Sequence, residues 1–283
     1  MVAKSSCPSG ALSFLRHDLG ILKIDFYGQT SFTPARQPPC APQYFSRIFK
    51  FTGMTFAEKI IDFNNQLHYT GSALPPGIRI MNPFREYPEA RRVSEIFYRK
   101  YYSDINTRHL ILGINPGRFG AGLTGIPFTD PKRLVSECHI EYNGPPAHEP
   151  SSVFIYEMIN AFGGPERFYG KLYINSLCPL GFTSIDAKGK ETNYNYYDSP
   201  ALATTVNDFI VENIRTQIGL GIQTDACFCF GTGKNENYLR KLNDKHHFFG
   251  KIVALEHPRF IMQYKSKSKQ QYIDKYLAAF AGL

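Results

Sequence analysis

The chain has 283 residues, of which 43% are hydrophobic and 20% charged, and this composition excludes a disordered chain, a collagen-like repeat and a coiled coil. The net charge is +8, and no run of 18 or more apolar residues occurs, so we expect a globular protein without a membrane-spanning helix. The N-terminal stretch has charged residues between short apolar runs, unlike a secretory signal, so we expect a cytoplasmic or nuclear protein that is not secreted.

Residues 1–53 differ from the rest of the chain. They include the proline-rich segment Thr33–Pro42, which no regular element tolerates, and six basic residues against two acidic ones. We expect an irregular N-terminal extension here, either a natural upstream segment or a leader added to the protein. Thr55-Phe-Ala-Glu58 is then a capping box that opens a helix, so a single compact domain is expected over residues 54–283.

Apolar periodicity predicts helices and short buried strands in alternation after that point. The predicted helices cover residues 55–67, 89–102, 152–162, 201–218, 235–242 and 270–280. The predicted strands cover residues 109–114, 171–175, 226–230 and 251–255. This alternation predicts an open α/β sandwich with a mainly parallel sheet, and such sheets bind ligands beyond the carboxyl ends of their strands.

Three of the predicted strands are followed by segments that suit a binding site. The first is Gly113–Phe128, with five glycines and two prolines in sixteen residues, and it matches neither a phosphate-binding loop nor a dinucleotide-binding one. Asn115 in this loop either caps a turn or faces a ligand. The other two are Asn175–Phe182 and the His257-Pro258 step, although a histidine after a strand is more often a polar cap.

The C-terminal segment is basic, while the body of the chain is neutral. Residues 54–256 hold 21 basic and 21 acidic side chains, and residues 257–283 hold five against one. Lys265 and Lys267 belong to the cluster Lys265-Ser-Lys-Ser-Lys269, which suits contact with phosphates because cationic side chains release counterions there. The alternative is the solvated start of a helix.

The six cysteines are dispersed over the chain, and no CxxC pair occurs. Zinc-finger and iron–sulfur spacings are therefore absent, and we expect reduced thiols and no metal site.

The motifs at the strand ends, taken together, resemble those of a known protein family. Gly113-Ile-Asn-Pro-Gly117 with Thr124-Gly-Ile-Pro-Phe128, then Leu177-Cys-Pro-Leu180, then His257-Pro258 resemble the uracil-DNA glycosylase superfamily, most closely its single-strand-selective monofunctional branch. The resemblance covers about residues 80–280. It implies a three-layer α/β/α sandwich around a central four-stranded sheet, and a monofunctional DNA glycosylase of base excision repair that needs no cofactor. The implied partner is single- or double-stranded DNA with deaminated bases, bound by a monomer.

The resemblance also assigns roles to residues. Asn115 would hold the attacking water, Phe128 would stack on the extruded base, and His257 would hydrogen-bond the departing base. Ile114 and Gly117 would contact the substrate beside Asn115. These roles suit the chemistry, because negative charge grows on the leaving base and an amide orients water but is a poor general base.

The chain departs from the family pattern directly before Leu177. The family has an asparagine there that reads the edge of uracil, whereas this chain has Ser176, with Asn175 one residue earlier. Strand alternation points Asn175 to the opposite face unless a bulge exchanges the two. A hydroxyl both donates and accepts, so with Ser176 facing the base we expect looser base choice, extending to xanthine and hypoxanthine.

A second departure follows His257, where Arg259-Phe-Ile-Met262 replaces the family's sequence. Arg259 and Phe260 are expected to contact DNA, and Phe260, Ile261 or Met262 either fills the gap left by the flipped base or packs under the last helix. Asp130 either contacts water or base or caps the next helix. The polar loops 141–150 and 191–200 are candidates to border the DNA channel, which the sequence does not decide.

Two other functions compete with the glycosylase. One is a DNA-binding module that has lost turnover, with Ser176 marking the decay. The other is an α/β enzyme that acts on free nucleosides or nucleotides. Release of base from oligonucleotides or from monomers distinguishes them.

Overall fold

The computed structural model describes residues 23–24, 30–31 and 53–283. Its contacts divide the chain into two units, residues 1–45 and 46–283. In the first unit, β1 (Lys23–Ile24) pairs antiparallel with β2 (Thr30–Ser31). The rest of the expected N-terminal extension, including its proline-rich segment, lies outside the described residues.

The predicted central sheet is confirmed. It is built from β4 (Arg108–Gly113), β5 (Leu172–Ser176), β8 (Ile222–Phe230) and β9 (Lys251–Leu255). The order is β5-β4-β8-β9, and every neighbouring pair is parallel. β8 starts before the predicted Ala226, because its polar first half continues past a register shift opposite His109 and Leu110.

The six predicted helices are found at their expected positions with one exception, and several short helices that were not predicted lie between them. The long ones are α2 (Phe56–Gln66), α4 (Pro88–Tyr102), α7 (Pro150–Phe162), α11 (Lys234–His246) and α13 (Lys269–Phe280). The short ones are α3 (Pro83–Glu86), α5 (Ala121–Thr124), α6 (Pro131–Ser136), α8 (Pro165–Lys171), α12 (Pro258–Tyr264) and the 3₁₀ turn η1 (Ser266–Ser268). Among the residues described, no helix has the length and apolar character needed to cross a membrane.

The exception is the predicted helix over residues 201–218, which is wrong as a single element. The structure has two helices there, α9 (Pro200–Thr205) and α10 (Asn207–Gly219), separated by Val206 with φ −97° and ψ 2°. Three β-branched residues in succession, Thr204, Thr205 and Val206, weaken the helix at this point, while the apolar spacing continues across it.

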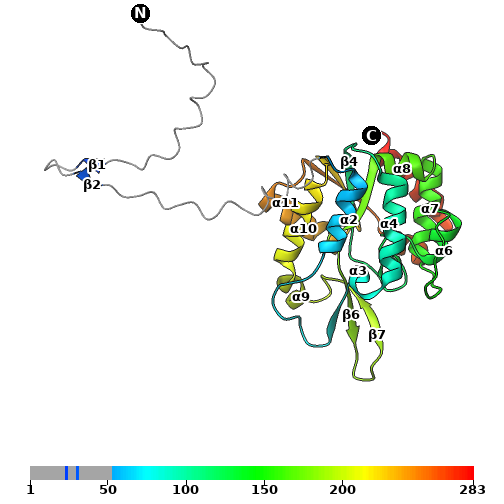
Figure 1. Ribbon diagram of the computed structural model, residues 1–283, viewed down its shortest axis with the longest axis horizontal. Helices are drawn as coiled ribbons and strands as arrows, with labels where there is room; N and C mark the ends of the chain where they lie inside the picture. The colour runs from blue at the N-terminus through cyan, green and yellow to red at the C-terminus, as the bar shows by residue number, and fades with distance from the viewer. Residues whose placement is uncertain (1–22, 25–29, 32–52) are drawn as a thin grey trace, which may run out of the picture. The chain divides into compact units, whose positions relative to one another are not determined.

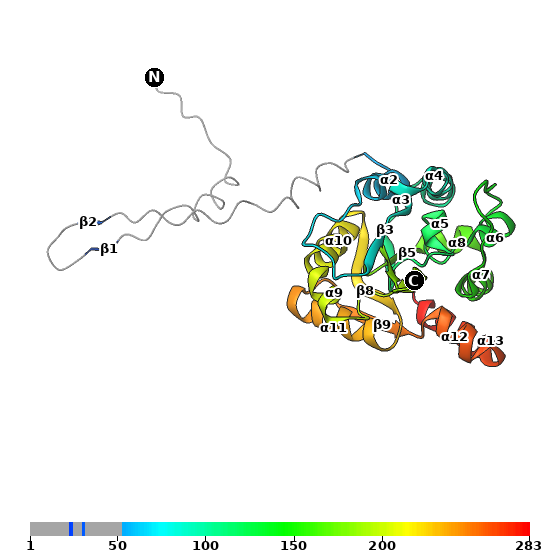
Figure 2. The same ribbon diagram turned by 90° about the horizontal axis from the view of Figure 1, so that it is seen from below.

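The two faces of the sheet bury separate apolar layers. The register places Tyr173 of β5 and Phe228 of β8 on opposite faces. Tyr173 contacts Phe56 of α2 with a ring-centroid distance of 5.6 Å, and Phe228 contacts Phe280 of α13 at 4.8 Å. Figure 2 shows α2 and α4 on one side of the sheet and α13 on the other. The expected three-layer α/β/α sandwich is therefore confirmed.

A second sheet was not predicted. It is antiparallel, with order β3-β6-β7, and consists of β3 (Ile78–Met81), β6 (Gly181–Ile185) and β7 (Glu191–Tyr194). The segment 191–200, expected to be a polar loop, thus begins with a strand. Figure 1 shows the β6–β7 hairpin projecting from the body of the domain.

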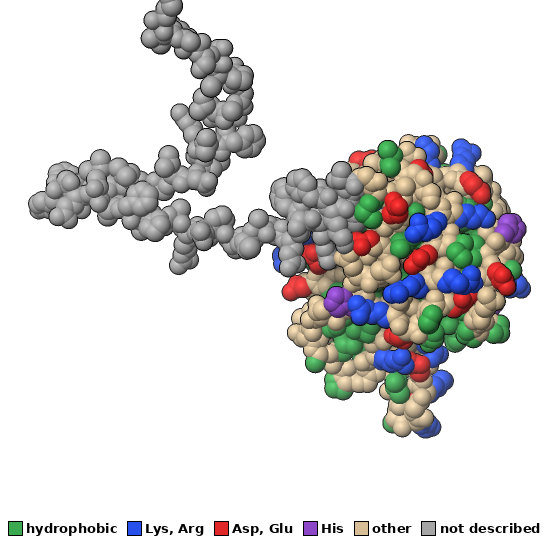
Figure 3. Space-filling model, in the orientation of Figure 1, with side chains coloured by type: hydrophobic (Ala, Val, Ile, Leu, Met, Phe, Trp, Pro, Cys, Tyr) green, Lys and Arg blue, Asp and Glu red, His purple; other side chains and the backbone are tan. Residues whose placement is uncertain are grey.

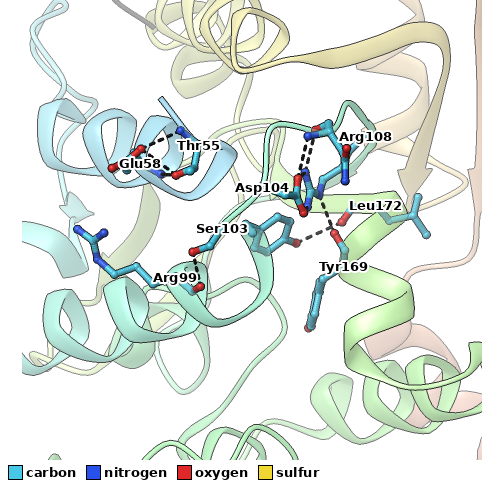
Figure 4. A network of polar contacts seen from close by, with 10 residues as sticks. Thr55, Glu58, Arg99, Ser103, Asp104, Arg108, Tyr169 and Leu172 are labelled. Atoms are coloured by element: carbon cyan, nitrogen blue, oxygen red, sulfur yellow. Dashed lines mark hydrogen bonds and ion pairs between the residues drawn. The ribbon is translucent and has the colours of Figure 1, made fainter. Parts of the chain in front are cut away.

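The amino end of β4 is held by a buried arginine, Arg108, whose side chain is fully enclosed. Its Nε donates to the carbonyl of Tyr169 at 2.7 Å, and its two terminal nitrogens donate to the two carboxylate oxygens of Asp104 at 2.9 and 2.7 Å. The guanidinium also lies 4.6 Å from the ring centroid of Phe56 and 4.8 Å from that of Tyr102. Every face of this buried charge has a partner, as Figure 4 shows for the polar contacts.

The predicted capping box is present at the start of α2 and is drawn in Figure 4. The backbone N–H of Glu58 donates to Oγ1 of Thr55, and the backbone N–H of Thr55 donates to the Glu58 carboxylate. The cap fixes where α2 begins and thereby places Phe56 under the sheet.

The surface of the domain mixes charges of both signs. On the face shown in Figure 3, Lys and Arg side chains are interspersed with Asp and Glu. This distribution agrees with the balanced charge of residues 54–256.

Candidate active site

A cavity of about 500 Å³ lies beyond the carboxyl ends of β4, β5 and β9. Three separated segments meet there: Ile114–Gly117 after β4, Ser176 at the end of β5, and His257 after β9. Phe128 from the glycine-rich loop lines the same cavity. The side chains that sequence reasoning selected are thus brought together where parallel sheets bind ligands.

The amide of Asn115 is held in one orientation. Its Oδ1 accepts the backbone N–H of Tyr196 at 3.1 Å, and its Nδ2 donates to the carbonyl of Tyr194 at 3.2 Å. Because a backbone N–H only donates and a carbonyl only accepts, the amide cannot be flipped. Oδ1 keeps a second lone pair for another donor, such as a water molecule.

Phe128 has a strained backbone, with φ of +55°, in the region that non-glycine residues rarely occupy. Its ring centroid lies 5.6 Å from that of Phe230 and 5.5 Å from that of His257. A Cβ at Gly113 would lie 3.0 Å from the Phe128 ring, so the glycine that ends β4 makes room for it. The ring is thereby fixed as one wall of the cavity.

His257 is the N-cap residue of α12, and its ring is oriented by that role. The backbone N–H of Arg259 donates to Nδ1 at 3.1 Å, so Nδ1 accepts and the proton of a neutral ring must lie on Nε2. Burial, with a smaller contribution from the positive charge of Arg259, lowers the pKa of His257 to about 4. At neutral pH the site therefore contains an uncharged imidazole that donates from Nε2.

Ser176 and Asn175 face opposite sides of β5, as strand alternation predicts. Ser176 lines the cavity, whereas Asn175 does not. Nδ2 of Asn175 donates to the hydroxyl of Tyr173 at 2.7 Å, on the other face of the sheet. The β4–β5 register runs without a shift through both residues, so no bulge exchanges them, and the structure does not support Asn175 as a base-reading residue.

α12 places the residues after His257. Arg259 and Phe260 line the cavity, and Phe260 is 41% exposed. Ile261 is fully buried in the core, which removes it as a residue that enters DNA. Tyr264, one turn after Phe260 and 64% exposed, also lines the cavity and was not predicted.

Lys265 and Lys267 lie outside the cavity lining, exposed in the turn after α12. Their predicted contact with phosphates stays a prediction. Asp130 has the structural role, because its carboxylate accepts the backbone N–H groups of Arg133 at 2.8 Å and Glu149 at 2.7 Å and caps α6.

Sequence reasoning missed several cavity residues in the two polar loops that it left undecided. They are Glu149, Asn193, Asn195 and Tyr197. The only signal was the polarity of these loops, since neither belongs to a strand-end motif. In the part of the chain that the structure describes, no three His, Cys, Asp or Glu side chains are grouped so as to hold a metal ion.

Comparisons with known proteins agree with this geometry. The family model described as the uracil DNA glycosylase superfamily matches residues 99–281. Among solved structures, the crystal structure of wild-type SMUG2 from Pedobacter heparinus is 68% identical to the chain, with a TM-score of 0.80. The similarity covers 81% of this chain and 98% of that one. A comparison with curated proteins found no match.

Three observations agree on the family of this chain. They are the matched family model, the identity with a solved structure, and the convergence of the strand-end motifs on one cavity. The chain therefore belongs to the uracil-DNA glycosylase superfamily, in its SMUG-like branch, and is a DNA glycosylase, a hydrolase of N-glycosidic bonds.

Proposed function

We propose that this enzyme is a monofunctional glycosylase that removes uracil, and also xanthine and hypoxanthine, from DNA. The observation that supports the proposal is the meeting of Asn115, Phe128, Ser176 and His257 in one cavity. A nucleotide must leave the base stack to reach such a cavity, and this costs least for mismatched or single-stranded bases.

Asn115 and Phe128 position the reactants. The extruded base stacks on the Phe128 ring, and the second lone pair of Asn115 Oδ1 accepts a hydrogen bond from the attacking water. Because the backbone of β7 and of the loop after it holds the amide at both ends, little reorganisation is required when the water binds.

His257 stabilises the leaving group. As the glycosidic bond breaks, negative charge develops on the base, and Nε2–H of the neutral imidazole donates to its carbonyl oxygen. The low pKa keeps the ring uncharged across the physiological range, so the site holds this donor without a buried cation.

Ser176 supports the wider base range. An asparagine side chain presents one acceptor and one donor group in a fixed arrangement, whereas the Ser176 hydroxyl rotates to donate or to accept. Uracil, xanthine and hypoxanthine differ in the hydrogen-bond donors and acceptors along their edges. A hydroxyl that rotates can pair with any of the three.

Two cavity residues, Arg259 and Phe260, and two lysines outside the cavity lining, Lys265 and Lys267, contact DNA outside the base. Arg259, Lys265 and Lys267 suit phosphate contacts, and Phe260 fills the gap in the stack. We expect the enzyme to act as a monomer, since all of these groups come from one chain.

The test is a panel of oligonucleotides that contain uracil, xanthine, hypoxanthine or hydroxymethyluracil, with alkali to reveal abasic sites. Wild type should yield strand breaks only after alkali, and His257→Ala should lower the rate of uracil release about 10²–10³-fold. Ser176→Asn should shift the preference towards uracil. Ser176→Ala, which has neither the hydroxyl nor an amide, serves as the variant without a hydrogen-bonding side chain. Absence of base release by wild type, or unchanged selectivity in both Ser176 variants, would contradict the proposal.

A further inference from the structure

We propose that Glu149 is a further catalytic residue, the general base that takes a proton from the water that Asn115 holds. This inference rests on the proposed function, since it concerns the same cavity and the same hydrolysis.

The position of Glu149 suggests a helix cap, but its side chain does not serve as one. It is the N-cap residue of α7 and makes no side-chain capping bond. Its backbone alone is used: its carbonyl accepts the hydroxyl of Ser152 at 2.7 Å, and its N–H donates to Asp130. Ser, Thr, Asp and Asn are the side chains that usually cap a helix, and the longer Glu149 side chain is not held at the start of α7.

The carboxylate points instead into the cavity and lies against the turn that follows Asn115. A Cβ at Gly120 would lie 1.9 Å from Oε2 of Glu149, and a Cβ at Gly117 would lie 3.3 Å from Oε1. The carboxyl group therefore occupies space that exists because both positions are glycine. The glycine-rich loop thus holds Asn115 on one side and accommodates Glu149 on the other.

The Glu149 carboxylate has no hydrogen-bond partner among the residues that the structure describes. Both oxygens are free to accept from water. Burial and the negative charge of Asp130 raise its pKa, Arg259 opposes them, and the resulting pKa of about 7 allows the group to exchange a proton near neutral pH.

The charged and titratable groups around Glu149 come from several elements. Asp130 lies before α6 and is itself bound by Arg133 and by His148, with Nδ1 of His148 3.1 Å from Oδ2 of Asp130. The cavity adds, from the loop after β7 and from α12, Tyr197, His257, Arg259 and Tyr264. The pKa of His257 is about 4, so this histidine does not titrate in the same range as Glu149.

The chemistry of the step needs such a base. The water oxygen forms a bond to C1′ of the deoxyribose while the C1′–N bond breaks, and the electron pair of that bond leaves with the base. One proton of the water passes to the Glu149 carboxylate, and the products are an abasic deoxyribose with a C1′ hydroxyl, protonated Glu149 and the base as its anion. The amide of Asn115 orients the water but does not accept this proton, because a neutral amide is too weak a base.

The first test is single-turnover release of uracil by Glu149→Gln, which keeps the size of the side chain and removes the base. The rate constant should fall about 10²-fold or more, while DNA binding changes little. Glu166→Gln, an exposed acid on α8 outside the cavity lining, is the matched control and should match wild type.

Two further readouts separate a base from a merely structural residue. The wild-type rate should rise with pH up to a plateau, with a midpoint near the pKa of Glu149, and this limb should be absent in Glu149→Gln. Added formate should restore part of the rate of Glu149→Ala, because it supplies a small carboxylate to the same space. A Glu149→Gln rate within a few-fold of wild type, or an unchanged pH limb, would refute the role of Glu149 and leave the proposed function intact. No base release by wild type would overturn both.

Discussion

At the amino end of β4, the guanidinium of Arg108 is buried and bonded on every side, to Asp104, to backbone carbonyls and to two aromatic rings. At the carboxyl end of the same sheet, the Glu149 carboxylate and the His257 imidazole line a cavity with few partners. One end of the sheet thus contains a charge that is fully compensated, and the other contains groups whose environment opposes their charged forms.

The amino end of the sheet therefore contributes to stability, whereas the groups at the carboxyl end lower stability and are available for chemistry. The raised pKa of Glu149 means that stability is lost as pH rises from about 4.5 to about 7, because the unfolded chain releases a proton that the folded one keeps. The lowered pKa of His257 means that stability is lost as pH falls from 6.5 to about 4, because the unfolded chain takes up a proton that the folded one does not. The ionisable groups of the site therefore lower the stability of the fold both at high and at low pH.

The largest expected effect comes from breaking the compensated end. Arg108→Ala should lower the free energy of unfolding by about 3–5 kcal/mol, because Asp104 and the Tyr169 carbonyl lose their partner and a cavity remains. Denaturant unfolding measures this change. Below its melting temperature the variant should release uracil at the wild-type rate, since the site lies at the other end of β4.

The exposed Arg99 on α4 provides the control. Arg99→Ala should change stability by less than about 0.5 kcal/mol. If Arg108→Ala lowers the free energy of unfolding as little as Arg99→Ala does, the Arg108 guanidinium does not stabilise the amino end, and the two ends of the sheet do not differ in this way.

A smaller effect, of opposite sign, is expected at the reactive end. Glu149→Gln removes a group whose pKa is raised from 4.5 to about 7, so it should stabilise the protein by up to roughly 3 kcal/mol near pH 8. At about pH 4 both proteins are uncharged at this position, and the difference should vanish. Thermal unfolding at the two pH values measures it.

A gain in stability together with a loss of activity would mark Glu149 as a group retained for chemistry. Equal stability of Glu149→Gln and wild type at the higher pH would show that the surroundings of Glu149 do not disfavour its ionised form.

The smallest effect concerns the start of α2, which places the Phe56 ring against Arg108. Thr55→Ala removes the oxygen that accepts the Glu58 N–H and should cost about 1 kcal/mol of stability. Thr55→Ser, which keeps the cap, should stay close to wild type. Denaturant unfolding compares the two, and an equal loss in both would show that the cap itself contributes nothing.

Much of the fold was predictable because its signals are local. The four parallel strands are short apolar runs, and the capping box of Thr55 and Glu58 marks a helix start within four residues. The β3-β6-β7 sheet was missed because its strands are short and partly polar, and Ile78 pairs with Ser184 far along the chain. The break at Val206 was missed because apolar spacing outweighed the run of β-branched residues.

The candidate site was predictable where motifs follow strands, and Asn115, Phe128, Ser176 and His257 all lie in the cavity. The roles assigned to them stay proposals that the assays above test. Glu149 was not predictable, because it lies in a polar loop that resembles any other and enters the cavity only through the fold.

The sequence by itself determined the alternation of helices and strands, the motif residues at the strand ends and the opposite faces of Asn175 and Ser176, because each depends on periodicity within a few residues. Only the tertiary structure decided that the β7 backbone fixes the amide of Asn115, that α12 fixes the tautomer of His257, and that Glu149 meets the glycines of a distant loop. Those features depend on distance and burial between segments far apart in the chain, which no local pattern encodes.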